Sequence, residues 1–544
     1  VFSVKAQFQL IDSNGKVLGN GSLATLAAPN AERLGANSSQ GKTISMDFKY
    51  YSDDASAIKN LRFNTQAQQN QYFAIFVPGY FAGKQITAVK FKLVSLSEVS
   101  NVKAWASKKL PKTSETADIC ESVAELLTEN TVTLSTPLTI PEEGCYVGYS
   151  FFSQGGTTSS CMWWYDYPLK AAGANYRCAE DAPDWRDYSG DGYCSNLVAT
   201  ISGEFASNDV VIDNQYQEII ATKGGAAEAA LNVKNIGSSS LDNLEYTVTD
   251  AATGNLLKTA VLNTHGVAPG KSCGFAFDLG PTDALTQTKR VVTITKVNGE
   301  EITKSDRVVA SGMVKVLAQF YPRKVVVEEG TGTWCGYCPR GIVGMEKMYK
   351  EFPDNFIGIA VHDDNEMGVG ENYYSLLNYF SGFPGCIANR QEKYNTDPNE
   401  NELRRIISAE KDKGEAQIEA QAYWKDGSKN EVTVTTASRF AYSGNNVDVR
   451  IAYAVTEDGV GPYMQANYYS GGTLEGWGDK DSRVSTVFND VARGIYDYNG
   501  VSGSVPGVIN VGDTYNYEYT FTLPSNVANK DNVNIVAMLI NGET

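Results

Sequence analysis

Residues 324–341 of this chain read KVVVEEGTGTWCGYCPRG. The apolar residues 325–327 are typical of a short buried strand, and from Ile342 to Phe352 apolar residues recur at three- and four-residue steps, which predicts a helix. A second apolar run at 356–361 has the composition of a parallel central strand. The order strand, loop, helix, strand predicts an α/β domain built around the two cysteines of the loop.

Cys335 and Cys338 form a Cys-x-x-Cys pair, which is compatible with a zinc site, a structural disulfide or a redox dithiol. Zinc needs two more ligands, and only Cys386 and His362 lie near enough in the sequence, so we expect no metal. At the start of a helix, free N–H groups and the helix dipole stabilise a thiolate. The position therefore predicts that Cys335 is a nucleophile and that Cys338 resolves its mixed disulfide.

The segment Trp334-Cys335-Gly336-Tyr337-Cys338 resembles the thioredoxin active site, and Gly382-Phe383-Pro384 resembles the cis-proline loop of that family. The resemblance implies a thioredoxin-like domain that needs no bound cofactor and exchanges disulfides with protein thiols or an extended peptide. It also implies which residues contact the substrate: Trp334, Gly336, Tyr337, Phe383 and Pro384.

The same resemblance places Glu329 where thioredoxins keep a buried acid that passes a proton to the second cysteine. A carboxyl buried there has a raised pKa and can act as a general base, whereas the alternative is a carboxylate that meets solvent at the end of the strand. Cys386 departs from the thioredoxin pattern. It is either a third thiol able to trap Cys335 or a small buried side chain in a strand.

The longer string from Glu328 to Gly341, with Ala360-Val361-His362-Asp363 and Asn389-Arg390 downstream, resembles the twenty-eight-kilodalton outer membrane protein family of Bacteroidetes-type bacteria. The resemblance covers roughly residues 320–544. It implies an exported protein at the outer membrane or the cell surface, held there as a lipid-anchored protein. It implies a location more strongly than a reaction.

Short strands separated by turns of Gly, Asn, Ser and Pro flank the α/β domain on both sides. We therefore expect a multidomain, mainly β chain with one α/β domain. The predicted domains are a jelly-roll-like β-sandwich at 1–206, an immunoglobulin-like β-sandwich at 207–318, the thioredoxin-like domain at 319–414 and a C-terminal immunoglobulin-like β-sandwich at 415–544.

Nine cysteines occur, five of them in the N-terminal region, and this density is typical of an oxidising compartment. Cys178 and Cys194 flank a polar loop, so we expect a disulfide between them, and we expect a second between Cys120 and Cys145. Buried free thiols are the alternative.

The formal net charge is −17, and no run of Lys or Arg forms a basic stripe, so nucleic acid is not an expected partner. No stretch of about 18 apolar residues is present, and we expect membrane contact only through an anchor absent from this chain. The chain begins at Val1 without a basic and apolar leader, and we expect either a mature chain or one trimmed of its targeting segment.

An aromatic cluster in the predicted N-terminal domain has two interpretations, a platform for a glycan or a protein partner, or the filling of a core. Its members are Trp163, Trp164, Tyr165, Tyr167, Trp185 and Tyr188.

Two functions fit the sequence. The first is a cell-envelope thiol–disulfide oxidoreductase with Cys335, Cys338 and Glu329 as its catalytic residues. The second is a surface adhesion or glycan- or protein-binding protein in which the thioredoxin-like domain is non-catalytic. Exposure of the Cys335 sulfur separates the two, because a reactive thiol must be reachable.

Overall fold

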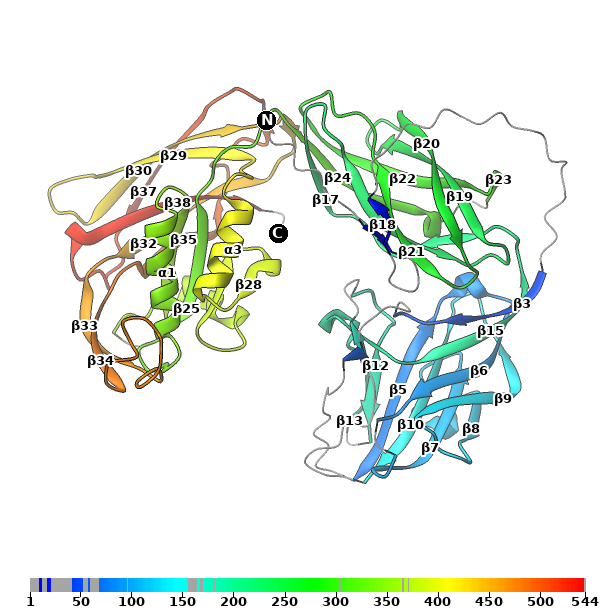
Figure 1. Cartoon of the computed structure of the whole chain (residues 1–544). Coiled ribbons are helices and arrows are strands. Elements are labelled where there is room, and N and C mark those ends of the chain that lie inside the picture. Colours follow the sequence, from blue (N-terminus) through cyan, green and yellow to red (C-terminus); the bar gives the residue numbers. More distant parts are fainter. Residues whose placement is uncertain are drawn as a thin grey trace. The chain divides into compact units, whose positions relative to one another are not determined.

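The structure, a computed structural model (Figure 1), describes residues 42–51, 68–94, 96–154, 170–180, 182–302, 305–363, 366–369 and 371–542, together with short strands at 9–11, 17–20, 57–58 and 164–166. The chain forms two compact units. Unit 1 contains residues 1–217, 228–279 and 290–312, and unit 2 contains residues 218–227, 280–289 and 313–544. The finer division into four domains stays a prediction.

The N-terminal part of unit 1 is a sandwich of two antiparallel sheets. The larger sheet contains, in spatial order, β13 (Ala182–Asp187), β12 (Tyr176–Ala179), β5 (Gln69–Val77), β10 (Cys145–Ser153), β7 (Val99–Ser107) and β8 (Ile119–Ser122). The other contains β3 (Lys42–Phe48), β15 (Val198–Phe205), β6 (Gln85–Lys92) and β9 (Glu129–Thr139). Smaller sheets are formed by β1 (Gln9–Ile11) with β2 (Val17–Asn20), and by β14 (Tyr193–Ser195), β11 (Trp164–Asp166) and β4 (Ala57–Ile58). Alternate side chains of both larger sheets meet in one core, where Phe91 stacks on Tyr149 with ring centroids 4.4 Å apart.

The two disulfides expected in this sandwich are absent. No disulfide joins Cys178 to Cys194 or Cys120 to Cys145, so the expectation was wrong, and for Cys120, Cys145 and Cys178 the alternative of free thiols holds. Strand β7 lies between the strands that carry Cys120 and Cys145, and two strand spacings of about 4.8 Å exceed the reach of a disulfide. Cys178 and Cys194 belong to strands of two different sheets.

The rest of unit 1 is a second β region. Its three-stranded sheet contains β16 (Val210–Ile212), β18 (Glu228–Asn235) and β21 (Ser272–Asp278). Strand β19 (Leu241–Asp250) pairs with β20 (Leu256–Val267) and with β22 (Gln287–Val297), which also pairs with β23 (Glu300–Glu301). Tyr246 of β19 packs edge-on against Phe277 of β21 at 4.9 Å, so a shared core joins the two sheets.

Unit 2 is organised around a seven-stranded sheet. Its strands are, in spatial order, β28 (Asn395–Thr396), β27 (Gly385–Ala388), β25 (Val325–Thr331), β26 (Phe356–His362), β35 (Val491–Val501), β32 (Val449–Glu457) and β38 (Val533–Asn541). Strands β25 and β26 are parallel and are joined by helix α1 (Pro339–Glu351), which confirms the predicted order strand, loop, helix, strand. Strand β27 pairs with β25 in the antiparallel direction.

Helices cover the β25–β26 part of this sheet. Helix α1 and helix α3 (Glu400–Glu410) bury apolar side chains at helical spacing on one face, including Met345, Met348 and Leu403. Helix α2 (Glu371–Tyr374) continues into the 3₁₀ helix η5 (Ser375–Tyr379), which supplies Leu376 and Leu377 to the core on the other face. In the described part of the chain, no helix has the length and apolar character that crossing a membrane requires.

The C-terminal strands extend the same sheet and do not stand apart from it. Strand β26 pairs with β35 at Ala360 and Val491, and the backbone N–H of Ala360 donates to the carbonyl oxygen of Asp490 at 2.8 Å. Strands that precede and strands that follow the predicted boundary at residue 414 therefore belong to one sheet.

A second sheet of β29 (Ala416–Trp424), β30 (Glu431–Phe440) and β37 (Tyr515–Thr522) packs on the C-terminal half, which gives the expected β-sandwich character.

The remaining strands of unit 2 are β17 (Glu218–Thr222), paired with β24 (Val309–Leu317), the hairpin β33 (Val460–Ala466) and β34 (Arg483–Phe488), and β31 (Gly444–Asn445), paired with β36 (Val508–Ile509). The other 3₁₀ helices of the chain are η1 (Gly79–Phe81), η2 (Ser114–Thr116), η3 (Ser189–Asp191), η4 (Asp306–Val308), η6 (Glu392–Tyr394) and η7 (Lys530–Asn532).

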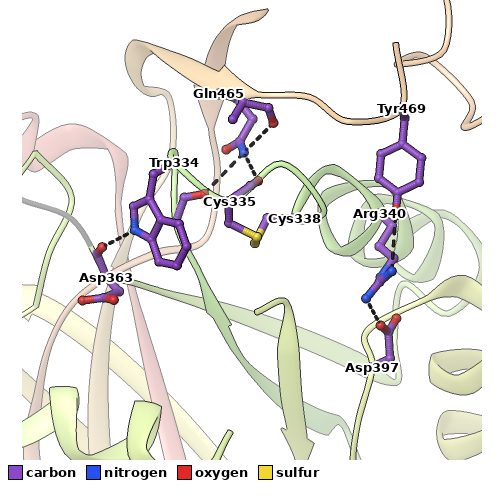
Figure 2. Close-up of a disulfide and its surroundings, with 10 residues drawn as sticks. Trp334, Cys335, Cys338, Arg340, Asp363, Asp397, Gln465 and Tyr469 are labelled. Carbon is purple, nitrogen blue, oxygen red and sulfur yellow. Dashed lines mark hydrogen bonds and ion pairs between the residues drawn. A yellow bond between two sulfur atoms is a disulfide. The ribbon is translucent and has the colours of Figure 1, made fainter. Parts of the chain in front are cut away.

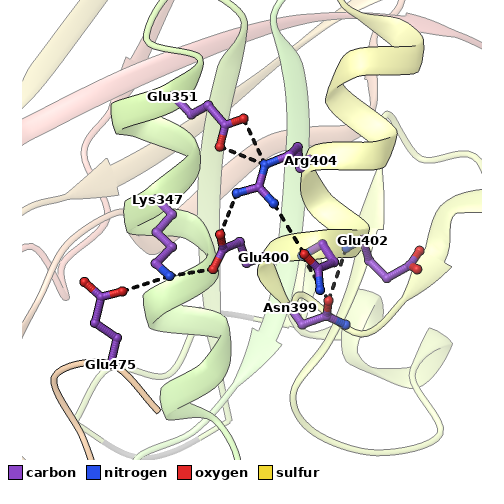
Figure 3. Close-up of polar contacts among 8 residues, drawn as sticks. Lys347, Glu351, Asn399, Glu400, Glu402, Arg404 and Glu475 are labelled. Atoms are coloured by element: carbon purple, nitrogen blue, oxygen red, sulfur yellow. Dashed lines mark hydrogen bonds and ion pairs between the residues drawn. The ribbon is translucent and has the colours of Figure 1, made fainter. Parts of the chain in front are cut away.

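Unit 2 contains two kinds of ion pair. On the surface, Arg404 of α3 bonds Glu351 of α1 at 2.9 Å, and Lys347 of α1 bonds Glu400 at 2.5 Å, with all four side chains about one third exposed (Figure 3). Inside the sheet, Arg493 donates to Glu457 at 2.8 Å, and both residues are at most 2% exposed.

These surroundings predict different costs for losing one partner. Arg493→Leu leaves the Glu457 carboxylate buried without its cation, and we expect a loss of about 3–5 kcal/mol in the free energy of unfolding. Arg404→Ala removes only solvent-screened contacts and should cost less than about 1 kcal/mol. Urea unfolding of both variants measures the difference, and equal losses would contradict the prediction.

Candidate functional site

The site begins with the two cysteines at the start of α1, which form a disulfide with their Cα atoms 5.4 Å apart (Figure 2). Cys338 is the N-cap residue of the helix, and Pro339 takes the first helical position, where its missing N–H leaves no intrahelical hydrogen bond unmade. The Cys338 N–H donates to the Cys335 carbonyl oxygen at 3.2 Å and closes the turn. Cys335 is 5% exposed and Cys338 is fully buried.

The residues expected to contact a substrate gather beside this disulfide. The Phe383–Pro384 peptide bond is cis, and strand β27 after it places Gly385 opposite Gly330 of β25. Phe383 packs against Trp334 with ring centroids 5.7 Å apart. The Trp334 indole N–H donates to the Asp363 carbonyl oxygen at 2.8 Å, although the ring is 54% exposed. Tyr337 is equally exposed on the other side of Gly336, while Pro384 is buried.

Glu329 is buried beneath the first turn of α1. The carboxyl is 2% exposed, which rules out the alternative in which it meets solvent. A Cβ atom at Gly341 would lie 1.9 Å from Glu329 Oε1, so the carboxyl fits against the helix only because residue 341 is glycine. Among the described residues, Oε1 has no hydrogen-bond partner. Burial, with the charges of Asp397 and Asp490, raises the pKa of Glu329 to about 8.

Cys386 lies directly opposite Glu329 across the β25–β27 pairing, so both side chains point to the same face of the sheet. It is fully buried in the core under α1 and α3, and burial raises the pKa of its thiol. This placement is that of the small buried side chain and not of a reachable third thiol. In the described ranges, no three or more His, Cys, Asp or Glu residues are placed to hold a metal ion.

One part of the site was not predicted from the sequence, a segment that we call the strap, residues 465–469. Gln465 and Ala466 end strand β33, and the strap runs along the loop that carries the cysteines (Figure 2). The Ala466 N–H donates to the Thr333 carbonyl oxygen at 2.8 Å, and the Tyr468 N–H donates to the Gly336 carbonyl oxygen at 2.9 Å. The strap lies 130 residues beyond the cysteines, and no motif or periodicity marks it.

The strap also contacts the helix that follows the disulfide. Arg340 Nη1 donates to the Tyr469 hydroxyl at 3.3 Å, and the same guanidinium pairs with Asp397. A further ion pair of 2.9 Å joins Lys347 of α1 to Glu475, in the loop after the strap (Figure 3). The first turn of α1 is thus held by the C-terminal region as well as by its own sheet.

The N-terminal aromatic cluster shows no platform in its described part. Trp163 and Tyr167, and the side chain of Trp164, lie outside the described residues. Tyr165 is buried and stacks on Tyr51 at 3.9 Å. Trp185 is partly buried and donates from its indole N–H to the Pro111 carbonyl oxygen at 2.7 Å. Tyr188 lies under the guanidinium of Arg177 at 4.0 Å. Glycan binding stays a prediction.

Taken together, the fold and the site define a mainly β, multidomain chain with a disulfide at the head of a helix in its C-terminal unit. Residues 371–544 match the family model described as outer membrane protein Omp28. This match supports the predicted resemblance over these residues and a cell-envelope protein. It begins beyond the Cys335–Cys338 disulfide. No curated protein matches the chain.

Several solved structures are similar to parts of the chain. HBP35 of Porphyromonas gingivalis has 14% sequence identity and a TM-score of 0.30, over 40% of this chain and 69% of that one. The CARDB domain of the PF1109 protein from Pyrococcus furiosus has 20% identity and a TM-score of 0.15, over 20% of this chain and 93% of the domain. A putative β-galactosidase from Bacteroides fragilis has 12% identity and a TM-score of 0.19, over 57% and 44%. At these TM-scores the likenesses carry no argument about fold or function.

The buried carboxyl predicts how stability depends on pH. The pKa of Glu329 is about 8 in the folded protein and near 4.5 for an unperturbed carboxyl, so the folded state binds the proton more tightly. This stabilisation is complete below about pH 4.5 and is lost as the pH rises through about 8, a change on the order of 5 kcal/mol. Urea unfolding between pH 5 and 8.5 should show this loss in the wild type, whereas Glu329→Gln should keep only the smaller loss from Asp490, whose pKa burial raises to about 6. Glu346→Gln, at an exposed carboxyl of α1, should keep the wild-type profile.

The contact between Gly341 and Glu329 gives a second prediction. Gly341→Ala places a methyl group on the buried carboxyl and should lower the free energy of unfolding by about 1–3 kcal/mol. The control is Gly427→Ala, whose added Cβ would meet nothing within 4 Å, and it should change stability by less than about 0.5 kcal/mol. An unchanged Gly341→Ala protein would mean that the carboxyl lies elsewhere.

Proposed function

We propose that this chain is a cell-envelope protein whose residues 319–414 form a thioredoxin-like unit that exchanges disulfides through Cys335 and Cys338. The single observation that carries the proposal is the disulfide at the start of α1 with the buried, unpartnered carboxyl of Glu329 beneath the same helical turn. A structural disulfide has no need of such a carboxyl, whereas a disulfide that opens must give a proton to its leaving thiolate.

The reaction follows from the burial of the two sulfurs. A partner thiolate attacks Sγ of Cys335, which is the more exposed of the two cysteines, and the Cys335–Cys338 bond breaks. Cys338 leaves as a thiolate and takes a proton from Glu329, whose pKa of about 8 keeps it protonated near neutral pH. A second partner thiolate then attacks the mixed disulfide and releases Cys335 as a thiolate. The partner is oxidised and the Cys335–Cys338 pair is reduced, and the reverse sequence oxidises the pair.

The partner in this proposal is a protein thiol or disulfide presented in an extended peptide. Trp334, Gly336, Tyr337, Phe383 and Pro384 contact it, and no bound cofactor is needed. The exposed rings of Trp334 and Tyr337 on either side of Cys335 support a docking surface at this place. The match to the Omp28 family supports an exported protein at the outer membrane or cell surface, and a lipid anchor outside this chain would hold it there.

One observation favours the second function, a surface adhesion or glycan- or protein-binding protein with an inert disulfide. Cys335 is only 5% exposed, as expected for a disulfide that no partner reaches.

The reduction potential of the Cys335–Cys338 pair decides between the two functions. We expect a value between about −120 and −270 mV in a glutathione series read by alkylation mass, the range of working oxidoreductases. A value below about −300 mV marks a structural disulfide and would move the assignment to adhesion.

Single-cysteine variants test the roles of the two thiols. Cys335→Ser should abolish disulfide reductase activity, and Cys338→Ser should accumulate a mixed disulfide between Cys335 and a partner, because the resolving thiol is gone. Cys386→Ser serves as the control and should retain activity, since Cys386 is buried on the core face of the sheet. Wild-type turnover in Cys335→Ser would refute the assignment.

A further inference from the structure

Four carbonyl groups of the cysteine loop accept hydrogen bonds from the strap. The Thr333 and Gly336 oxygens accept from the backbone of the strap at 2.8 and 2.9 Å. The oxygens of Gly332 and Cys335 accept from Gln465 Nε2, at 3.3 and 2.9 Å. Four carbonyl groups within five residues are thereby bonded by the strap.

Gln465 is the centre of this arrangement. The side chain is fully buried, and its Nε2 group also donates to the Ala466 carbonyl oxygen at 3.0 Å. The amide oxygen Oε1 has no hydrogen-bond partner within the described part of the chain. The reverse orientation of the amide would set Oε1 against three carbonyl oxygens, which repel it, so only the observed orientation fits. A buried amide oxygen without a hydrogen bond is costly, and the hydrogen bonds that Nε2 donates offset this cost.

The strap fixes the direction of the peptide dipoles around Cys335. In a trans peptide the C=O and N–H groups point in opposite directions. Because the strap holds the carbonyl groups of Thr333, Cys335 and Gly336, the N–H groups of the same three peptides point away from it. Figure 2 shows Gln465 and the disulfide sulfur on opposite sides of the Cys335 backbone. The N–H groups, which carry partial positive charge, therefore face the side on which a Cys335 thiolate would lie.

We propose that Gln465 is a positioning residue for Cys335, which holds the carbonyl groups of the loop away from the sulfur and so stabilises the thiolate. The proposal rests on the proposed disulfide exchange. Without the Gln465 donors, the Cys335 carbonyl group keeps only the 3.2 Å hydrogen bond from the Cys338 N–H and can tilt toward the sulfur, where its partial negative charge disfavours a thiolate. A less stable thiolate makes the reduced pair less stable, so the disulfide becomes harder to reduce.

Gln465→Met in the full chain is the direct test, because methionine has a similar length and no donors. We expect Cys335 in the reduced protein to react about three- to tenfold more slowly with iodoacetamide at pH 7. The reason is that loss of the free energy of about one hydrogen bond raises the pKa of its thiol. The reduction potential of the Cys335–Cys338 pair should become more negative by about 15–30 mV, which is the same three- to tenfold factor expressed as a potential. The control is Ser504→Ala, which removes a buried hydroxyl that donates to the Val501 carbonyl oxygen, far from the loop in sequence. Its potential should equal that of the wild type.

A second test leaves Gln465 in place. A Cβ atom at Gly336 would lie 2.4 Å from the Tyr468 ring, so Gly336→Ala should push the strap away from the loop. The double variant carries both Gly336→Ala and Tyr468→Ala. Removing the Tyr468 ring relieves this clash, while the backbone N–H of residue 468 remains as a donor. We expect the shift in potential and in Cys335 reactivity to appear in Gly336→Ala and to be largely reversed in the double variant.

The outcomes separate this inference from the proposed function. If the wild-type potential lies in the oxidoreductase range and neither Gln465→Met nor Gly336→Ala changes the Cys335 pH profile, the positioning role is overturned and disulfide exchange stands. If the wild-type potential lies below about −300 mV, disulfide exchange itself fails, whatever Gln465 does. A shift of the same size in Ser504→Ala would show that general loosening of the fold, and not Gln465, moves the potential.

Discussion

Strand β25 is paired on both sides, with β26 in parallel and with β27 in the antiparallel direction, and every part of the site depends on this pairing. It fixes the end of the strand from which the cysteine loop departs. It sets Gly385, just after the cis Phe383–Pro384 bond, opposite Gly330. It also turns Glu329 toward α1. Alternate residues of a strand share one face of the sheet, so Glu329 lies on the same face as Val325 and Val327, which form the core under the helix. A one-residue slip in this register would move the carboxyl to the other face of the sheet.

The opposite face of β25 offers a glutamate different surroundings from those of Glu329. Glu328, one residue earlier, accepts hydrogen bonds from Arg390 and Tyr373 at 2.8 Å, so its buried charge is compensated. Among the described residues, no cation pairs with Glu329, and burial raises its pKa. Two adjacent glutamates thus differ in the partners that the two faces supply, and the raised pKa of Glu329 suits it to carry a proton near neutral pH.

Much of the local structure of the site could be predicted from the sequence. The helix start at Cys338-Pro339, the strand before it and the cis bond at Pro384 all depend on residues close together in the chain or on a distinctive motif. The burial of Glu329 was left open, since a single acid at a strand end carries no signal of which element covers it. The expected disulfides between Cys178 and Cys194 and between Cys120 and Cys145 were wrong, because spacing along the chain says nothing about which strands separate two thiols. The pairing of β26 with β35 and the strap depend on contacts more than a hundred residues apart, which no local pattern encodes.

The distance between the cysteines and Gln465 has a consequence for the order in which the site comes into being. A chain is made from its N-terminus, so both cysteines, α1 and Glu329 exist before the segment that braces their loop has been synthesised. During that interval the thiols belong to an incomplete sheet whose edge strand β26 still lacks its neighbour β35. The first oxidation of this pair therefore takes place on a nascent, unbraced loop or waits for the last strands, and the properties of the mature disulfide are those of a site completed from its C-terminal end.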